Sequence, residues 1–322
     1  MNASTAHRPS SPVVGLHHVA LAVHDIAGAS RFYREGAGCQ PWPAAHMLEL
    51  PTGAMPLCSS NAGLVLLPAD PAAVPVRRPV SESGIAHLCL QTPDLAGLLK
   101  RMRALGAVLH SEPVDLGTGF LYCYARDAEH NVIEIEGVAA VWQHPQAWLA
   151  HANVVSHDLP KLVDFYSRWL AATAVRSPRL HSDRRLDSLA DLSQVQTRMA
   201  WLNAGNAQIE LMQYLHPATT AATGRRAAGA PGYVHLAFEV TSLALAREHL
   251  LGCGGRLDDA PAAAAVQSWQ ARGFDADGNR LLLLDLHAPA HQDLRIDALA
   301  EPGVTQRFAA ARGTVAAIAA PS

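Results

Sequence analysis

The sequence predicts an α+β fold built from four copies of one unit, in which a strand and a helix are followed by three strands. Three observations predict this fold. A histidine recurs four times on a short apolar run, a helix N-cap residue follows each histidine at one distance, and a second apolar run closes each unit. A chain of 322 residues suffices for roughly two domains, so the units are expected to pair.

Each unit begins with a strand that carries the histidine. The four histidines are His18, His87, His151 and His235. The residues seven positions later are Asp25, Asp94, Asp158 and Ser242, all of which are good N-caps. Apolar residues then recur at three- and four-residue steps, which predicts helices over residues 26–34, 95–105, 159–170 and 243–251.

Each unit ends with a strand at a regular step from its histidine. The step is 47 residues in units one, two and four and 59 residues in unit three. It leads to Val65, Glu134, Glu210 and Leu282. The additional residues of the third unit fall in the polar stretch 179–196, so the repeat itself is preserved.

Composition limits the class of protein. Apolar residues make up 49% and charged residues 16%, which indicates packed cores rather than disorder. A net charge of −3 provides no global basic field for nucleic acid, and no apolar run approaches the roughly 20 residues of a membrane helix. Five widely spaced cysteines without a CxxC pair and an N-terminus without an apolar signal core predict reduced thiols and a cytoplasmic location.

Changes in composition give the expected domain boundaries. Residues 1–12 form a polar tail, and residues 13–140 form a first domain with modules at 13–68 and 84–138. A linker is expected near residues 139–146. Residues 147–288 form a second domain with modules at 147–216 and 231–288, and residues 289–322 form a C-terminal tail.

The chain resembles the vicinal oxygen chelate superfamily, which includes glyoxalase I, methylmalonyl-CoA epimerase, extradiol dioxygenases, fosfomycin-resistance enzymes and bleomycin-binding proteins. The resemblance covers roughly residues 14–287, and the second half is most similar to the epimerase and glyoxalase branch. The residues that carry it are 16–25, 32–33, 127–136, 198–202, 208–211, 233–240 and 277–280. It implies that the modules pair into two curved, barrel-like mixed sheets with helices outside, and that a divalent metal is held by their first and last strands.

The resemblance makes six side chains candidate metal ligands. They are His18, His87, Glu134, His151, Glu210 and His235. Val65 and Leu282 stand at the positions of two further carboxylates and cannot bind a metal. If neighbouring modules pair, each half of the chain has a three-ligand site. If modules two and three pair, and one and four pair, a complete site of two histidines and two glutamates results. The sequence leaves both pairings open.

Strand alternation refines this candidate set. Successive strand residues face opposite ways, so only one of His17 and His18 is expected to face inward, and the repeat favours His18. Glu136 is expected at the solvent-exposed rim. A single histidine on an apolar strand is usually a core or surface residue, and the repetition in register favours ligands here. Arg184 and Arg185 in the long insert predict a solvated charged loop, with a clamp for an anionic substrate as the alternative.

These ligands and the resemblance imply a metal-dependent isomerase, epimerase or lyase. It would act on a small molecule with adjacent oxygens through a metal-stabilised enolate, and Glu134 or Glu210 would double as the proton shuttle. A second carboxylate in the site favours Zn, Ni, Co or Mn. The expected partner is the small-molecule substrate, without nucleic acid or membrane, and the expected state is a monomer or homodimer.

Two alternatives remain open. The order of His18, His87 and Glu134 matches the ligand triad of an Fe(II) extradiol ring-cleaving dioxygenase. However, Ala128 and His130 replace the proline and glycine of that family's turn next to the last ligand. The other alternative is a non-catalytic protein that binds an antibiotic or a similar small molecule, although such proteins typically lack the metal ligands.

Overall fold

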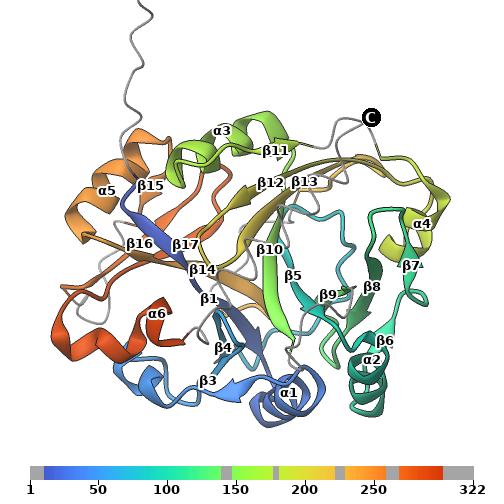
Figure 1. The fold of residues 1–322 in the computed structure, drawn as a ribbon, viewed down its shortest axis with the longest axis horizontal. Helices are drawn as coiled ribbons and strands as arrows, with labels where there is room; N and C mark the ends of the chain where they lie inside the picture. The colour runs from blue at the N-terminus through green and yellow to red at the C-terminus, as the bar shows by residue number, and fades with distance from the viewer. Residues whose placement is uncertain (1–10, 139–146, 177–180, 222–228, 259–267, 300–322) are drawn as a thin grey trace, which may run out of the picture.

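The structure is a computed structural model that describes residues 11–138, 147–176, 181–221, 229–258 and 268–299. These residues form two large mixed sheets with helices outside (Figure 1). The predicted α+β class and the two curved sheets are confirmed. Each sheet ends in a two-residue strand at both edges, so neither sheet closes into a barrel.

The two sheets have eight and nine strands. In spatial order the first sheet contains β15 (Arg256–Leu257), β16 (Gln270–Phe274), β17 (Arg280–Asp285), β14 (Gly232–Val240), β1 (Val13–Val23), β4 (Gly63–Pro68), β3 (Met55–Cys58) and β2 (Gln40–Pro41). The second contains β11 (Val175–Arg176), β12 (Gln196–Asn203), β13 (Gln208–His216), β10 (Trp148–Val155), β5 (Gly84–Thr92), β9 (Val132–Gly137), β8 (Leu121–Arg126) and β6 (Val108–Leu109), with β7 (Val114–Asp115) beside β8.

Strand pairing decides how the four modules combine. The first strand of module one, β1, pairs antiparallel with β14 of module four, and β5 of module two pairs antiparallel with β10 of module three. Within each module the first and last strands are parallel neighbours. Each half of the sequence therefore contributes one module to each sheet. The expected linker at residues 139–146 lies outside the described residues.

The helices begin where the sequence predicts. The module helices are α1 (Ile26–Arg31) with its continuation η1 (Phe32–Gly36), α2 (Leu95–Ala104), α3 (Leu159–Trp169) and α5 (Leu243–Gly252). The four predicted N-cap side chains each accept a hydrogen bond from a backbone N–H of the first turn. Each cap is worth about 1 kcal/mol. Further short helices are η2 (Pro43–Leu48), α4 (Arg184–Ala190), η3 (Pro289–Leu294) and α6 (Ile296–Leu299).

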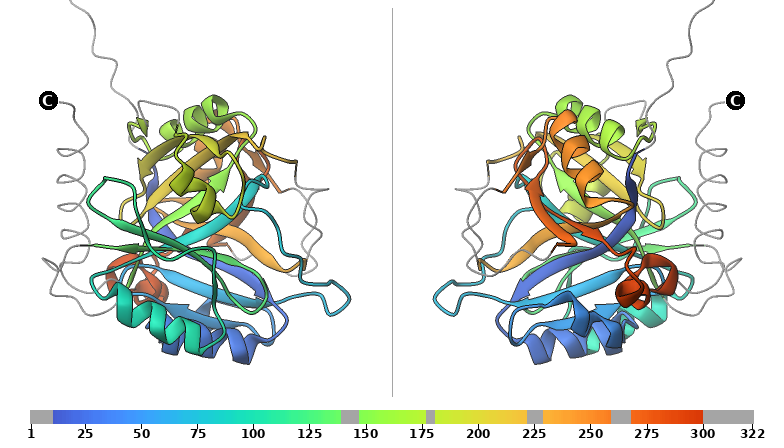
Figure 2. Two further views of the ribbon diagram at one scale, coloured as in Figure 1. Left: turned by 90° about the vertical axis from the view of Figure 1, so that its right-hand side faces the viewer. Right: turned by 90° about the vertical axis from the view of Figure 1, so that its left-hand side faces the viewer.

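The two modules of one sequence half meet through their helices. Helices α1 and α2 lie together at one edge of the molecule, and α3 and α5 lie together at the opposite edge (Figures 1 and 2). The Tyr33 hydroxyl donates to Asp127 of the next module at 3.3 Å, and the Tyr166 hydroxyl donates to Asp275 at 3.1 Å. The equivalence of these two contacts shows an internal two-fold relation between the halves.

A continuous apolar core draws residues from both sheets and from the module helices. Because strand residues alternate, Ile133 and Ile135 enter this core while Glu134 faces the other side of the second sheet. Two asparagines tie the sheets together at the core's edge. The side-chain N–H group of Asn206 donates to the carbonyls of Leu16 and Asn61, and its Oδ1 accepts from the N–H of Leu16.

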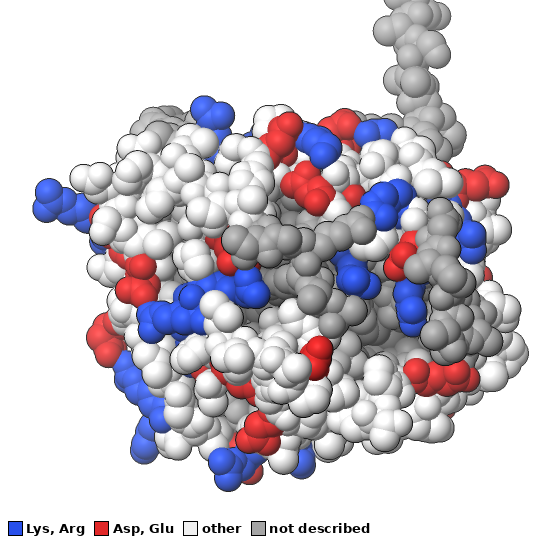
Figure 3. Space-filling view, turned by 180° about the vertical axis from the view of Figure 1, so that it is seen from behind, with Lys and Arg blue, Asp and Glu red and all other residues white. Residues whose placement is uncertain are grey.

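The surface carries both signs of charge. Basic and acidic side chains are interspersed on the face seen from behind (Figure 3). Within the described ranges, no helix is long and apolar enough to cross a membrane. All five cysteines are free thiols.

Candidate metal centre

The candidate ligands meet because of the register of four adjacent strands, β9, β5, β10 and β13. Two rows of side chains cross the sheet face that is turned away from the common core. The first row is Glu134, Cys89 and His151, and the second is His87, Asn153 and Glu210. Since neighbouring rows lie on the same face, the four ligand side chains can converge between them.

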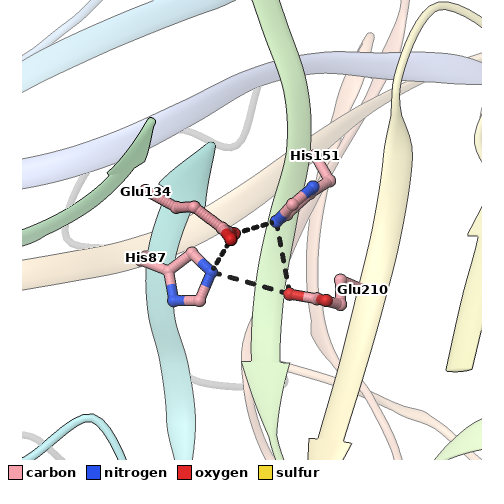
Figure 4. Close-up of side chains that lie close together, drawn as sticks. All are labelled: His87, Glu134, His151 and Glu210. Carbon is pink, nitrogen blue, oxygen red and sulfur yellow. Dashed lines mark hydrogen bonds and ion pairs between the residues drawn. The ribbon is translucent and has the colours of Figure 1, made fainter. Parts of the chain in front are cut away.

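Four donor atoms lie close together in this face (Figure 4). Oε2 of Glu134 is 3.2 Å from Nε2 of His87 and 2.8 Å from Nε2 of His151. Oε2 of Glu210 is 3.6 Å and 3.2 Å from the same two nitrogens. The sequence left two module pairings open. The pairing of module two with module three is the one that brings two imidazoles and two carboxylates together.

Burial and mutual charge control the protonation of this cluster. All four side chains are at most 5% exposed. Burial opposes charge on each of them. Hydrogen bonds to Glu134 and Glu210 nevertheless raise the pKa of His87. Cys89, Glu210 and Glu134 together raise the pKa of His151. Against the same burial, the imidazoles lower the pKa of Glu134 and Glu210. The two imidazoles and the two carboxylates therefore stabilise each other's charged forms.

The cluster fits a divalent ion in charge, chemistry and size. A doubly charged ion would balance the charge of the two carboxylates. Two nitrogen and two oxygen donors suit Zn, Ni, Co or Mn. An ion with bonds of about 2.1 Å separates adjacent ligand atoms by roughly 3.0–3.4 Å. The observed separations of 2.8–3.6 Å bracket this range.

Polar neighbours hold the ligands in place. The Asn153 side-chain N–H group donates to Oε2 of Glu210 at 2.8 Å. Among the described residues, Nδ1 of His87 and Oδ1 of Asn153 have no hydrogen-bond partner although they are buried. The expectation that Glu136 lies at a solvent-exposed rim is wrong. It is 7% exposed because it shares the inward face of β9 with Glu134, and burial and the charge of Glu134 raise its pKa to about 7.

An apolar layer covers the other end of this face. It includes helix α4 of the long insert and the segment before β5 (Figure 1). Its buried members are Val80, Tyr124, Val132, Val155, Leu186, Leu189, Ala190, Val195, Met212 and Tyr214. The charged residues of the insert serve the helix itself, since Asp183 caps α4 and forms an ion pair with Arg185. The insert therefore shields the cluster from water.

The other two candidate histidines meet in the first sheet without a carboxylate. His18 and His235 approach at 3.2 Å between their Nε2 atoms, and His17 lies 2.8 Å from His18 between their Nδ1 atoms. Nε2 of His17 lies 2.7 Å from the carbonyl of Leu294 and must donate to it. We assign a chain of neutral imidazoles in which each donates to the next, from His235 to His18 to His17.

This chain stays neutral because it is buried. Burial lowers the pKa of His17 to about 4, and burial with Arg272 and Arg280 lowers the pKa of His235 to about 4. Neither group of converging donor atoms within the described part of the chain includes His18 or His235. The predicted ligand triad of His18, His87 and Glu134 is therefore not brought together.

Two expectations about this second face are wrong for identifiable reasons. His17 and His18 are both buried in a strand that is covered on both faces, and a register irregularity between Leu16 and His18 lets their imidazoles contact each other. Residues 289–299, assigned to a tail, form η3 and α6 and bury Leu294 and Ile296. They lie beside η2 and contribute Leu294 to an apolar cluster that includes Val65 of β4 and Leu284 of β17.

Sequence reasoning missed three polar residues on the sheet face of the four candidate ligands, which we call the metal face, namely Cys89, Asn153 and Glu136. A usable signal was present. Cys89 and Asn153 stand two positions after a ligand histidine, and Glu136 stands two positions after a ligand glutamate. A period of two in a strand places each of them on the same face as its ligand.

Comparisons with known proteins identify the family and agree with the fold. A family model described as the Glyoxalase/Bleomycin resistance protein/Dioxygenase superfamily matches residues 15–135 and 148–283. No curated protein matches the sequence. Glyoxalase I from Zea mays superposes with a TM-score of 0.57 at 16% identity, covering 84% of this chain and 92% of that one. A single-residue mutant of the same enzyme gives a TM-score of 0.60 at 15% identity, with coverages of 84% and 93%.

A third solved structure extends over nearly the whole chain. It is a protein from Bacillus subtilis subsp. subtilis str. 168, provisionally described as a dioxygenase, with a TM-score of 0.58 and 11% identity. The alignment covers 97% of this chain and 98% of that one. At such identities the likeness concerns the fold alone, whereas the family match extends over more than half of the residues. The chain belongs to the Glyoxalase/Bleomycin resistance protein/Dioxygenase superfamily.

Proposed function

We propose that the protein is a metal-dependent isomerase, epimerase or lyase whose reaction is redox-neutral. Its substrate class is a small molecule with two adjacent oxygens. The observation that carries the proposal is the convergence of two imidazole nitrogens and two carboxylate oxygens within 2.8–3.6 Å on one buried sheet face. His87, Glu134, His151 and Glu210 would hold the ion.

The nature of the donors supports the choice of metal. Two carboxylates beside two imidazoles favour Zn, Ni, Co or Mn over the iron of a site with a single carboxylate. When bound, such an ion acts as a Lewis acid toward the adjacent substrate oxygens. The chain's own residues then orient the substrate, move its proton and keep water away.

We assign the proton-moving role to Glu210. Its Oε2 is farther from both imidazole nitrogens than that of Glu134, at 3.2 and 3.6 Å against 2.8 and 3.2 Å. The N–H group of Asn153 holds Glu210 in place at 2.8 Å, so its carboxylate stays oriented while it takes a proton from carbon and returns it. Such general base catalysis contributes typically 10²–10⁴-fold to the rate.

The surroundings support chemistry that must avoid water. Leu186 and Leu189 of α4 join Tyr124 and Tyr214 in the apolar layer over one end of the face. Excluding water strengthens the electrostatic interactions in the site and protects a reactive carbanion from unwanted protonation.

The test is solvent deuterium exchange. Protein purified anaerobically is analysed for metal and incubated in D₂O with a panel of small 2-hydroxy and 2-oxo carbonyl compounds. The expected result is bound Zn, Ni, Co or Mn and deuterium at the carbon next to a carbonyl. Glu210→Gln should lose the exchange, and His235→Ala is the control because it alters the equivalent histidine of the other sheet.

Two results would contradict the proposal. Iron together with oxygen uptake on a catechol would indicate the dioxygenase alternative. Tight binding of a small molecule without metal or turnover would indicate the non-catalytic binder.

A further inference from the structure

The metal face carries a second set of donors beside the first. Cys89 lies in register between Glu134 on β9 and His151 on β10. Glu136 lies two residues further along β9 on the same face. The Cys89 thiol, one carboxylate oxygen each from Glu134 and Glu136, and one nitrogen of His151 all lie within 4.8 Å of one another.

These donors are deeply buried. Cys89 is 0% exposed, and the other three side chains are at most 7% exposed. A polar group in the middle of a buried strand is costly unless its surroundings or a ligand compensate it. Four such groups together therefore indicate a position that a cation can occupy.

A chain of side chains fixes Glu136. Gln91 lies opposite Glu136 in the sheet and donates its amide N–H to Oε2. The indole N–H of Trp148 in turn donates to the Gln91 carbonyl oxygen at 3.0 Å. Outer contacts of this kind are typical of metal ligands, because they orient the coordinating group.

The set is not a by-product of the repeat. The residues two positions after the histidine in the other modules are Ala20, Asn153 and Ala237. The residues two positions after the end of the 47- or 59-residue step are Leu67, Met212 and Leu284. Module two alone places a thiol and an additional carboxylate at these positions.

We propose that Cys89, Glu134, Glu136 and His151 form a second, thiolate-containing metal position that takes thiophilic divalent ions such as Zn²⁺, Co²⁺ and Cd²⁺. One sulfur, one nitrogen and two oxygen donors suit these ions. Binding replaces the S–H bond of Cys89 by a bond from sulfur to the metal, and the proton leaves to the buffer. Glu134 and His151 belong to both sets, so the two positions share two ligands.

The experiment separates the two positions by the ion used. Metal-free full-length protein is titrated with Cd²⁺, and the near-ultraviolet charge-transfer band from thiolate to metal is recorded. A parallel titration with Mn²⁺, followed by electron paramagnetic resonance, reports the site of His87 and Glu210, since Mn²⁺ prefers oxygen donors. Neither readout depends on the reaction that the protein catalyses.

Three variants make the comparison specific. Cys89→Ser should lose the Cd²⁺ band and keep Mn²⁺ binding. Glu210→Gln should keep the band and lose Mn²⁺ binding. Cys123→Ser is the matched control and should keep both, because Cys123 is a buried thiol of β8 that faces the common core.

The proposal is overturned if Cd²⁺ binds the unmodified protein without a thiolate band, or if Cys89→Ser retains the band. ¹¹³Cd nuclear magnetic resonance of the unmodified protein checks for sulfur coordination without any substitution, so a folding defect in the variant does not obscure the result. If the unmodified protein does not bind Mn²⁺, that result instead counts against the four-ligand site of the proposed function.

Discussion

His18 and His87 stand at equivalent positions of two modules, yet their replacement by alanine should have opposite consequences. His87→Ala removes a ligand whose Nε2 contacts both Glu134 and Glu210. His18→Ala removes only the middle member of the neutral imidazole chain. We therefore expect loss of metal without His87, and full metal content with reduced stability without His18.

The magnitudes follow from the contacts. His18 is 1% exposed and makes two hydrogen bonds, to His17 and His235. Each lost neutral hydrogen bond costs about 1 kcal/mol, and a partner left unsatisfied raises the total to roughly 2–4 kcal/mol. For a chain of this size the melting temperature should fall by roughly 3–6 °C. His87→Ala should lower metal affinity by more than the roughly 10–100-fold typical of a lost outer-shell partner.

The assay combines metal content with thermal unfolding. Both variants are loaded with Mn²⁺, dialysed, and analysed for bound metal by plasma emission spectroscopy, and their metal-free forms are melted in a calorimeter. Retention of the metal by His87→Ala, or its loss from His18→Ala, would refute the assignment of the site to modules two and three.

Four further predictions concern the metal site and the stability of the fold. Glu134→Gln should reduce metal occupancy, measured by equilibrium dialysis, and should reduce activity. Its far-ultraviolet circular dichroism should stay unchanged. Metal affinity should rise from pH 6 to pH 8 in a competition titration, because His87 and His151, with raised pKa values, must release protons. The contribution of His87 to metal-free stability, measured as the difference in unfolding free energy between the unmodified protein and His87→Ala, should show the opposite trend. A raised histidine pKa stabilises the fold below about pH 6.5, and this contribution is lost as the pH rises through the folded pKa. Asn206→Ala should cost roughly 2–4 kcal/mol in denaturant unfolding because three buried hydrogen bonds are lost, whereas the exposed Gln40→Ala should change stability by less than about 0.5 kcal/mol.

Local features of the fold were predictable from the sequence. The N-caps at Asp25, Asp94, Asp158 and Ser242 depend only on the three residues that follow each cap, so their spacing sufficed. Glycines with positive φ end three of the module helices, at Gly38, Gly106 and Gly254, and Ala171 takes that conformation in module three.

Module pairing could not be predicted in the same way. Strand β1 has the same apolar pattern whether it pairs with β5 or with β14, and the choice depends on contacts between distant segments. One indication was that Val65 and Leu282 fall into the same sheet under one of the two pairings. The structure has this pairing, so both missing carboxylates belong to one face.

Irregular features of the fold could not be predicted from the periodicity of the sequence either. The alternation rule failed at His17 because a register irregularity in β1 brings the imidazoles of two successive histidines into contact. It held on β9, where applying it to Glu136 would have predicted an inward side chain. Residues 289–299 escaped detection because η3 and α6 are too short to show a helical period.

The most direct test of the central claim is anomalous diffraction from crystals grown with Mn²⁺. We predict one anomalous peak per chain between Nε2 of His87, Nε2 of His151 and the carboxylates of Glu134 and Glu210, about 2.0–2.3 Å from each donor atom. A peak beside His18 and His235 would contradict the account. So would the absence of a peak at the four predicted ligands when the protein in solution binds Mn²⁺.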